Sequence, residues 1–239
     1  MKIKFIQEII DIIRQKYSIK RVSKNNVIDI AKCNKKRIKL DIVGENNTIS
    51  IPTELKNNAQ IHIRIFGDNN KIIIKEGFTL SNKISILIGQ NHKNFGKVTN
   101  SEFIIDENTS IESMNYITFN SNTYCHIGKD CMFSFDIKLY NTDGHPIFDK
   151  DTGKLVNKVK GIEIGDHCWI GYGATILKNS IVPPDSIIGW NAVFSGGGAK
   201  SLSRCAFAGN PARVVKENVT WDSNGSNCGY IENVLDEDE

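Results

Sequence analysis

The chain has 239 residues, of which 40% are hydrophobic, and its 30 Lys and Arg residues nearly balance 27 Asp and Glu residues, which gives a net charge of +3. A single domain with a real core is expected at this length, whereas intrinsic disorder and a strongly basic nucleic-acid-binding surface are excluded. No apolar run reaches the roughly 18 residues of a membrane span, and charges interrupt the N-terminus too often for a secretory signal. We therefore predict a protein without a membrane span, located in the cytoplasm, with its six cysteines reduced.

The first predicted element is an amphipathic helix over residues 3–17. Its Ile residues recur at helical spacing, and charged side chains fill the other faces. A helix of this kind can anchor a protein to a membrane surface or cap the end of a β core. Because its charges are of mixed sign, the cap is favoured, and we assign residues 1–37 to this N-terminal helix and cap.

A repeat of six residues dominates the second half of the chain. From about residue 38, short Ile-rich segments alternate with Asn, Gly and Asp, and further on an apolar residue recurs at every sixth position. The fourth residue after each of these positions is always small. The apolar column is Ile164, Ile170, Ile176, Val182, Ile188 and Phe194, and the small column is Cys168, Ala174, Ser180, Ser186, Ala192 and Gly198.

A six-residue period predicts a coil with three straight sides of about six residues, in which the aliphatic side chains stack in a narrow interior. A looser copy runs through Ile105, Ile111 and Ile117 and then slips by four residues, which indicates a register shift or a bulge. The period fails over residues 138–161, so we predict that this loop is ejected from the coil. The β-helix is assigned to residues 38–217 and a C-terminal tail to residues 218–239.

The sequence resembles the hexapeptide-repeat acyltransferases in residues 164–175 and 208–213. Together with residues 127–134 and 143–149, it is most similar to the acetyl-CoA-dependent O-acetyltransferases of sugars and capsular polysaccharides. The resemblance covers roughly residues 100–217. Residues 20–95 are compatible with extra coils only in their pattern of short Ile-rich segments separated by polar residues. It implies an all-β, left-handed parallel β-helix, a homotrimer, acetyl-CoA as co-substrate, and as acceptor a hydroxyl of a capsular or lipopolysaccharide glycan, sialic acid included.

His145 is the predicted general base. It lies between Gly144 and Pro146 on the ejected loop, where packing does not explain it, and the resemblance adds weight through the Trp169 that follows 24 residues later. Neutral imidazole has a suitable pKa for removing the hydroxyl proton as the thioester is attacked. Asp143 could orient the ring or only cap the turn, and the sequence leaves both open.

The other histidines and the cysteines have structural explanations. His62 alternates with Ile in a strand and His92 lies in a polar run, so both are expected at the surface. His126 and His167 occupy coil positions beside the aliphatic column, where a structural role is favoured. Buried, inert thiols are expected for the coil cysteines, and a direct transfer without a covalent enzyme intermediate is preferred.

The coenzyme site is implied by the resemblance alone. It places Trp169 in the acceptor or thioester pocket, with packing on a neighbouring subunit as its other explanation, and it places the coenzyme in a groove between two subunits. The residues implicated in that groove are Tyr172, Trp190, Ser195, Lys200, Arg213 and Lys216, of which the last two are cations for the phosphates. Small residues are usual where Tyr172 and Trp190 stand, so the lining departs from the family pattern.

No metal site is predicted. Residues 149–153 lack the ligand spacing of a calcium loop, and the zinc site of the γ-class carbonic anhydrases requires two His five residues apart, which this chain does not offer. Two alternative functions remain: N-acetylation of a nucleotide-linked amino sugar, and a non-catalytic β-helix that serves as a binding or assembly module.

Overall fold

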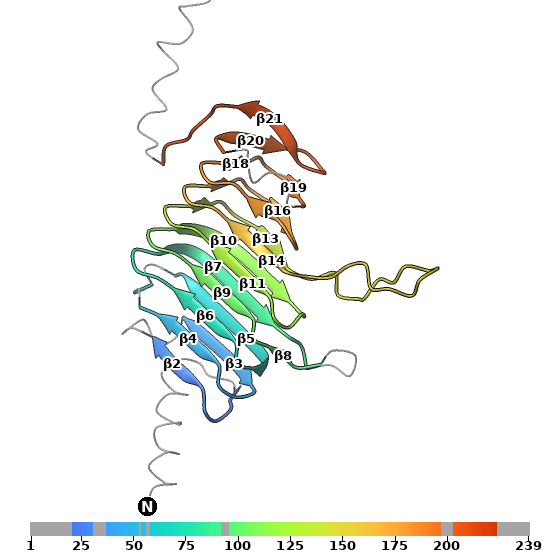
Figure 1. Ribbon diagram of the computed structural model, residues 1–239. Helices are drawn as coiled ribbons and strands as arrows, with labels where there is room; N and C mark the ends of the chain where they lie inside the picture. The colour runs from blue at the N-terminus through green and yellow to red at the C-terminus, as the bar shows by residue number, and fades with distance from the viewer. Residues whose placement is uncertain are drawn as a thin grey trace, which may run out of the picture.

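The computed structural model describes residues 21–30, 37–52, 54–55, 58–91, 96–196 and 203–223. In these residues every regular element is a β-strand, and the strands wind into stacked coils that form an elongated parallel β-helix (Figure 1). The first coil begins at Arg21, inside the segment that the sequence assigns to the N-terminal helix and cap. The helix predicted over residues 3–17 lies outside the described residues.

The coils are held together by two sheets. The smaller sheet, which we call the third face, contains seven parallel strands: β2 (Val27–Ile30), β4 (Thr48–Ile51), β6 (Lys71–Ile74), β9 (Glu102–Ile105), β11 (Tyr124–Ile127), β14 (Gly161–Ile164) and β17 (Ile181–Val182). The larger sheet begins with β1 (Arg21–Val22), β3 (Ile38–Val43), β5 (Gln60–Asp68), β7 (Thr79–Ile88) and β10 (Ser110–Thr118), and the short β8 (Val98–Thr99) pairs with β5.

At β10 the larger sheet divides into two further faces. The start of β10 pairs with the first face, which consists of β12 (Met132–Phe133), β15 (Trp169–Ile170), β18 (Ile187–Ile188) and β20 (Cys205–Ala208). The end of β10 pairs with the second face, which consists of β13 (Ile137–Tyr140), β16 (Thr175–Leu177) and β19 (Val193–Phe194). From β10 onward, three faces per coil make the body a triangular prism, as the six-residue period predicts.

The predicted interior is confirmed. All six residues of the aliphatic column are buried, and so are the five described members of the small column. Because in-register parallel pairing places equivalent residues on top of one another, the aliphatic residues stack from coil to coil, as Ile170 does with Ile188 and Ile176 with Phe194. Gly198, the last member of the small column, lies outside the described residues.

A bulge inside β10 shifts the upstream repeat before Ile117, ahead of the predicted slip between Ile117 and Ile127. The pairing of β10 with β7 shifts between Ile111 and Ser113, so Met114 and Tyr116 point inward and are fully buried. Ile117, which the simple six-residue period places in the interior, faces outward and is only partly buried. One extra residue reverses the side-chain alternation for the rest of the strand.

Asparagines form a polar column at one corner of the N-terminal coils. Asn47 and Asn70 are buried, and the Oδ1 of Asn47 accepts the backbone N–H of Asn70 at 2.9 Å. The amide of Asn70 in turn donates to the carbonyl of Val98, while its Oδ1 accepts the N–H of Ser101. Each amide therefore satisfies backbone groups that the turn leaves without a strand partner.

The C-terminal end of the helix is closed by the only antiparallel pair in the two sheets of the described chain. β21 (Arg213–Glu217) folds back on β20, and Ala212 and Val214 pack against the core. This hairpin covers what would otherwise be an open coil end with unpaired backbone groups.

Candidate active site

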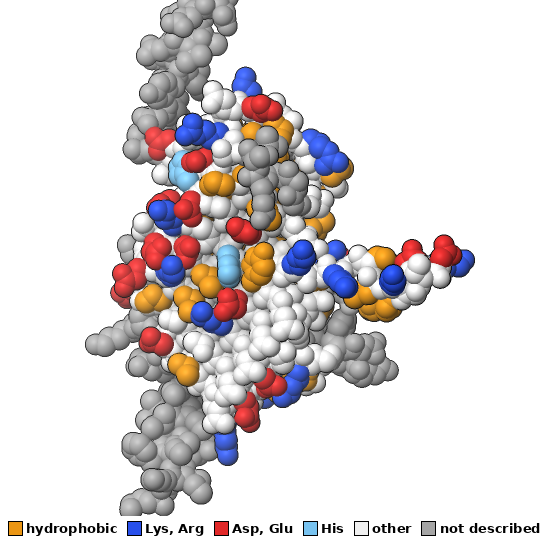
Figure 2. All heavy atoms as spheres, in the orientation of Figure 1, with side chains coloured by type: hydrophobic (Ala, Val, Ile, Leu, Met, Phe, Trp, Pro, Cys, Tyr) orange, Lys and Arg blue, Asp and Glu red, His pale blue; other side chains and the backbone are white. Residues whose placement is uncertain are grey.

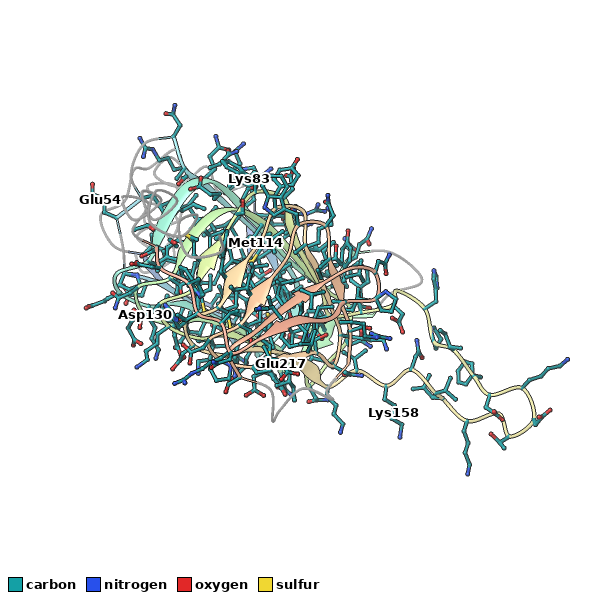
Figure 3. All side chains as sticks on the ribbon, turned by 90° about the horizontal axis from the view of Figure 1, so that it is seen from above. Glu54, Lys83, Met114, Asp130, Lys158 and Glu217 are labelled. Atoms are coloured by element: carbon teal, nitrogen blue, oxygen red, sulfur yellow. The ribbon has the colours of Figure 1, made fainter. Side chains whose placement is uncertain are left out.

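Residues 142–160 leave the coil between β13 and β14 and project far from it (Figures 1 and 3). The ejected loop is thus confirmed, although it starts later than residue 138 because Lys138–Tyr140 continue the ladder between β10 and β16. Its outer half is a hairpin in which Val156 donates its backbone N–H to Ile147 at 2.9 Å. The view along the coil axis shows Lys158 near the root of the loop and Asp130 on the opposite side of the body (Figure 3).

His145 lies in an open pocket of about 540 Å³ at the root of this loop. Phe119 and Asn120, which follow β10, and Gly96, which precedes β8, line the pocket from the body of the helix, and the two strands of the loop supply the rest. The pocket is therefore formed where a rigid corner meets the ejected segment, and it is wide enough to admit a sugar ring beside the imidazole.

Asp143 is held by two contacts at the loop root. Its Oδ2 lies 3.2 Å from the Nζ of Lys178, which projects from the turn after β16, and it accepts a hydrogen bond of 2.7 Å from the Nδ2 of Asn157. The turn that follows is capped by Thr142, whose hydroxyl accepts the N–H of Gly144. Asp143 thus ties the loop to the body, while the cap that the sequence offered as its other role belongs to Thr142.

Asn157 was missed by the sequence reasoning, because a single Asn in a polar loop carries no signal by itself. Besides Asp143, it contacts the backbone of the outgoing strand: its Nδ2 donates to the carbonyl of His145 at 2.9 Å, and its Oδ1 accepts the N–H of Ile147 at 2.8 Å. On the body of the helix, Asn179 follows Lys178. Its side chain anchors the returning strand of the loop by accepting the N–H of Lys160 and donating to the carbonyl of Lys158.

Trp169 stands on the first face, stacked between Met132 and Ile187 of the neighbouring coils. The loop leaves from the corner between the second and third faces, and in a triangular prism that corner is opposite the first face. Trp169 is also not among the residues that line the pocket. The structure of one chain therefore does not bring Trp169 together with His145.

A second tryptophan missed by the sequence reasoning covers this part of the first face. Trp221 follows β21, donates its Nε1–H to the carbonyl of His167 at 2.8 Å, and stacks on the His167 ring at 4.5 Å. Its ring centroid is 6.3 Å from that of Trp169, within the range of favourable aromatic contacts. In the segment before Trp221, the backbone N–H of Val219 donates a hydrogen bond to the carbonyl of Arg204.

The residues implicated in coenzyme binding lie toward the C-terminal end of the helix. Tyr172 and Trp190 occupy the corner between the first and second faces with ring centroids 5.9 Å apart, and Trp190 is 73% exposed. Arg213 and Lys216 are exposed on β21. Ser195 is exposed just after β19, and Lys200 lies outside the described residues.

His126 and His167 each face a carboxylate on the outer surface. The Nε2 of His126 lies 3.4 Å from Glu102, and the Nδ1 of His167 lies 3.0 Å from Asp185. Neither histidine lines the pocket at the loop root. Both arrangements agree with the structural role favoured for them.

The coil cysteines are buried. Burial raises the pKa of Cys125 far above its usual value, and contact with Cys131 together with burial does the same for the pKa of Cys168. A thiol held in its protonated form is a poor nucleophile, so these cysteines have the chemistry of small core residues.

Among the described residues, no group of three or more His, Cys, Asp or Glu side chains could hold a metal ion. In the same part of the chain, no helix is long and apolar enough to cross a membrane.

The comparisons with known proteins agree on one group of enzymes. No family model matches the chain. A polysialic acid O-acetyltransferase from Neisseria meningitidis is 32% identical over 190 residues, which cover 74% of this chain and 86% of that protein. A polysialic acid O-acetyltransferase from Escherichia coli O1:K1 is 36% identical over 96 residues, or 40% of this chain and 30% of that protein.

The structural comparison extends over almost the whole chain. The crystal structure of the polySia-specific acetyltransferase NeuO matches with a TM-score of 0.70 and 26% sequence identity, covering 92% of this chain and 99% of that one. The match confirms the expected left-handed parallel β-helix.

Proposed function

The chain belongs to the hexapeptide-repeat acetyltransferases related to the capsular polysialic acid O-acetyltransferases, and from this premise we propose that it transfers acetyl from acetyl-CoA to a hydroxyl of a capsular glycan. Two of its relatives, from Neisseria meningitidis and Escherichia coli O1:K1, are polysialic acid O-acetyltransferases by name, so a sialic acid polymer is the first acceptor to test. The observation that carries the proposal is the placement of His145 in the open pocket at the loop root.

In the proposed mechanism, His145 acts as the general base. The neutral imidazole accepts the proton of the sugar hydroxyl while the oxygen attacks the thioester carbonyl carbon. As the carbon–sulfur bond breaks, the imidazolium returns a proton to the departing sulfur, so the histidine ends the cycle neutral. Direct transfer is preferred because the coil cysteines are buried, and burial helps to hold the pKa values of Cys125 and Cys168 above their usual range.

We further propose that the complete site needs two chains of a homotrimer. The first support is that Trp169 and the pocket lie on opposite sides of one chain. The second is the loop itself, whose outer half exposes Ile147, Phe148 and Val156 to more than half of their full area. Figure 2 shows hydrophobic side chains along the loop next to its charged end. A neighbouring subunit would cover these side chains and present its Trp169 to the His145 of the first.

The coenzyme is proposed to lie in the groove between two such chains. Tyr172, Trp190 and Ser195 would line it, and the exposed Arg213 and Lys216 would meet the phosphates. A cytoplasmic location stays a prediction, in keeping with acetyl-CoA as the co-substrate.

The activity is tested by mixing purified protein with acetyl-CoA and a panel of acceptors, with thiol release and mass of the product as readouts. Acetylation of a sialic acid polymer or another capsular glycan, lost in His145→Ala, is the expected result. Acetylation of a nucleotide-linked amino sugar alone would replace the proposal with N-acetyl transfer.

The shared site is tested by complementation. His145→Ala and Trp169→Ala are each expected to be nearly inactive, but co-expressed chains should recover activity, because one chain supplies His145 and its neighbour supplies Trp169. Random assembly gives about one quarter of the sites both residues. A mixture no more active than the two variants apart would mean that both residues act within one chain.

A further inference from the structure

The root of the ejected loop carries a chain of contacts that ends at the backbone of His145. It begins on the body of the helix at Lys178, passes through the carboxylate of Asp143, and continues through the side chain of Asn157. The lysine is well shielded, with 19% of its side chain exposed, and Asp143 is 34% exposed. Ion pairs and hydrogen bonds that are partly withdrawn from water hold their geometry better than free surface pairs.

Asn157 uses both ends of its amide on the opposite strand of the loop. Its Nδ2 reaches the Asp143 carboxylate at 2.7 Å and the His145 carbonyl at 2.9 Å, and its Oδ1 takes the N–H of Ile147 at 2.8 Å. His145 is therefore bracketed on both sides by one side chain that is twelve residues away in sequence.

These contacts differ from the hydrogen bonds of the hairpin tip. At the tip, Asp149 accepts the N–H and the hydroxyl of Thr152, each at 2.7 Å, and these bonds stay within one turn. The Asn157 contacts instead join the outgoing strand to the returning one, at the level where both line the pocket with His145. They are placed to fix the position of the imidazole relative to the pocket wall.

We propose that Asn157, oriented by Asp143 and Lys178, is a positioning residue that holds His145 at the distance required for proton transfer. This inference rests on the proposed function, since it assumes that His145 is the base. Its physical basis is that a base displaced by about an ångström loses as much as a hundredfold in rate, although its own chemistry is unchanged.

The test compares Asn157→Ala with one matched control variant in the same loop, Thr152→Ala. Asn157→Ala should lower kcat by roughly tenfold to a hundredfold and leave the KM for acetyl-CoA within about twofold, because the coenzyme groove is untouched. Thr152→Ala removes a hydrogen bond of the tip and should leave both constants within about twofold. The thermal midpoint should not move in either variant, because the loop lies outside the coils.

The pH profile separates positioning from loss of the base. In Asn157→Ala the acid limb of log kcat/KM should keep its slope, since the base is present but misplaced, whereas His145→Ala should lose that limb. A flat profile in Asn157→Ala, or an unchanged kcat, would overturn the inference. If His145→Ala itself keeps the wild-type rate, the proposed function fails first, and the two failures are thereby distinguished.

Asp143 supplies the conservative control. Asp143→Asn keeps an oxygen that can accept from Asn157, so it should retain more activity than Asp143→Ala. An Asp143→Asn variant as impaired as Asp143→Ala, with its acid limb displaced to lower pH, would show that the carboxylate acts electrostatically on the imidazole, and the positioning role of Asp143 would be wrong.

Discussion

The N-terminal and C-terminal halves of the β-helix both stack coil on coil, but they use different side chains at the corners. In the N-terminal coils equivalent residues are far apart in sequence, as with Ile38 and Ile61, and buried asparagines satisfy the corners. In the C-terminal coils the spacing is tighter, as with Ile170 and Ile188, and the inward corner positions are taken by Cys, Ala and Ser.

This difference suggests that the N-terminal half contributes mainly to stability and the C-terminal half mainly to the candidate active site. In the N-terminal half, the buried polar side chains at the corner are hydrogen-bonded to the backbone of the same coils, so these corners are closed to ligands. The C-terminal half has short, regular coils that need little besides small residues at the corners, and the ejected loop, Trp169 and the β21 cations all belong to it. We therefore expect variants of the two halves to separate into those that impair catalysis and those that impair stability.

The largest expected effect is that of His145→Ala. It should reduce kcat by roughly a hundredfold to ten-thousandfold, the usual worth of a general base, with no change in the thermal midpoint. Steady-state kinetics and a melting curve on the same preparation check both parts. A variant that retains most of its activity would remove His145 as the base.

Asn70→Ala should show the opposite behaviour. It leaves the buried N–H of Ser101 and carbonyl of Val98 without their partners, which costs about 3 kcal/mol of unfolding free energy at roughly 1–3 kcal/mol per group. The kcat of the folded enzyme should be unchanged. Chemical unfolding measures the loss.

Asn115→Ala is the matched control for that variant, because Asn115 is an exposed residue of β10. It should change stability by less than about 0.5 kcal/mol. Equal effects of the two substitutions would show that the asparagine column contributes nothing beyond an ordinary surface residue.

A smaller effect is expected for the cations of β21. Arg213→Ala combined with Lys216→Ala should raise the KM for acetyl-CoA about tenfold with kcat nearly intact, because binding of the phosphates is equal in ground and transition states. The control removes the same charge from the N-terminal half, with Lys39→Ala and Arg64→Ala. If both double variants raise KM alike, the effect comes from net charge and not from a phosphate site.

The smallest effect concerns pH. Burial, with Lys83 and Lys39 nearby, lowers the pKa of His62 below its ordinary value of 6.5. The unfolded chain then binds a proton more readily than the folded one, so stability should fall as the pH drops below about 6.5 toward the lowered pKa. His62→Gln should lose less stability than the wild type between pH 7.5 and pH 5. Parallel losses would mean that His62 does not contribute.

What the sequence determined by itself was local and periodic. The aliphatic and small columns at positions such as Ile170 and Ala174 predicted the coil and its interior, and the interruption of the period predicted the loop with His145. These inferences succeed because a repeat imposes the same environment at each period, so position within the repeat is enough to assign a side chain inward or outward.

Only the tertiary structure decided which distant residues meet. The bulge after Ile111 depends on pairing with β7, and it turned Ile117 outward against the simple period. Asn157 reaches His145, and Trp221 reaches Trp169, through turns whose directions no local pattern encodes. Contacts of this kind arise from how one coil stacks on the next and where each corner points, and both are properties of the folded chain as a whole.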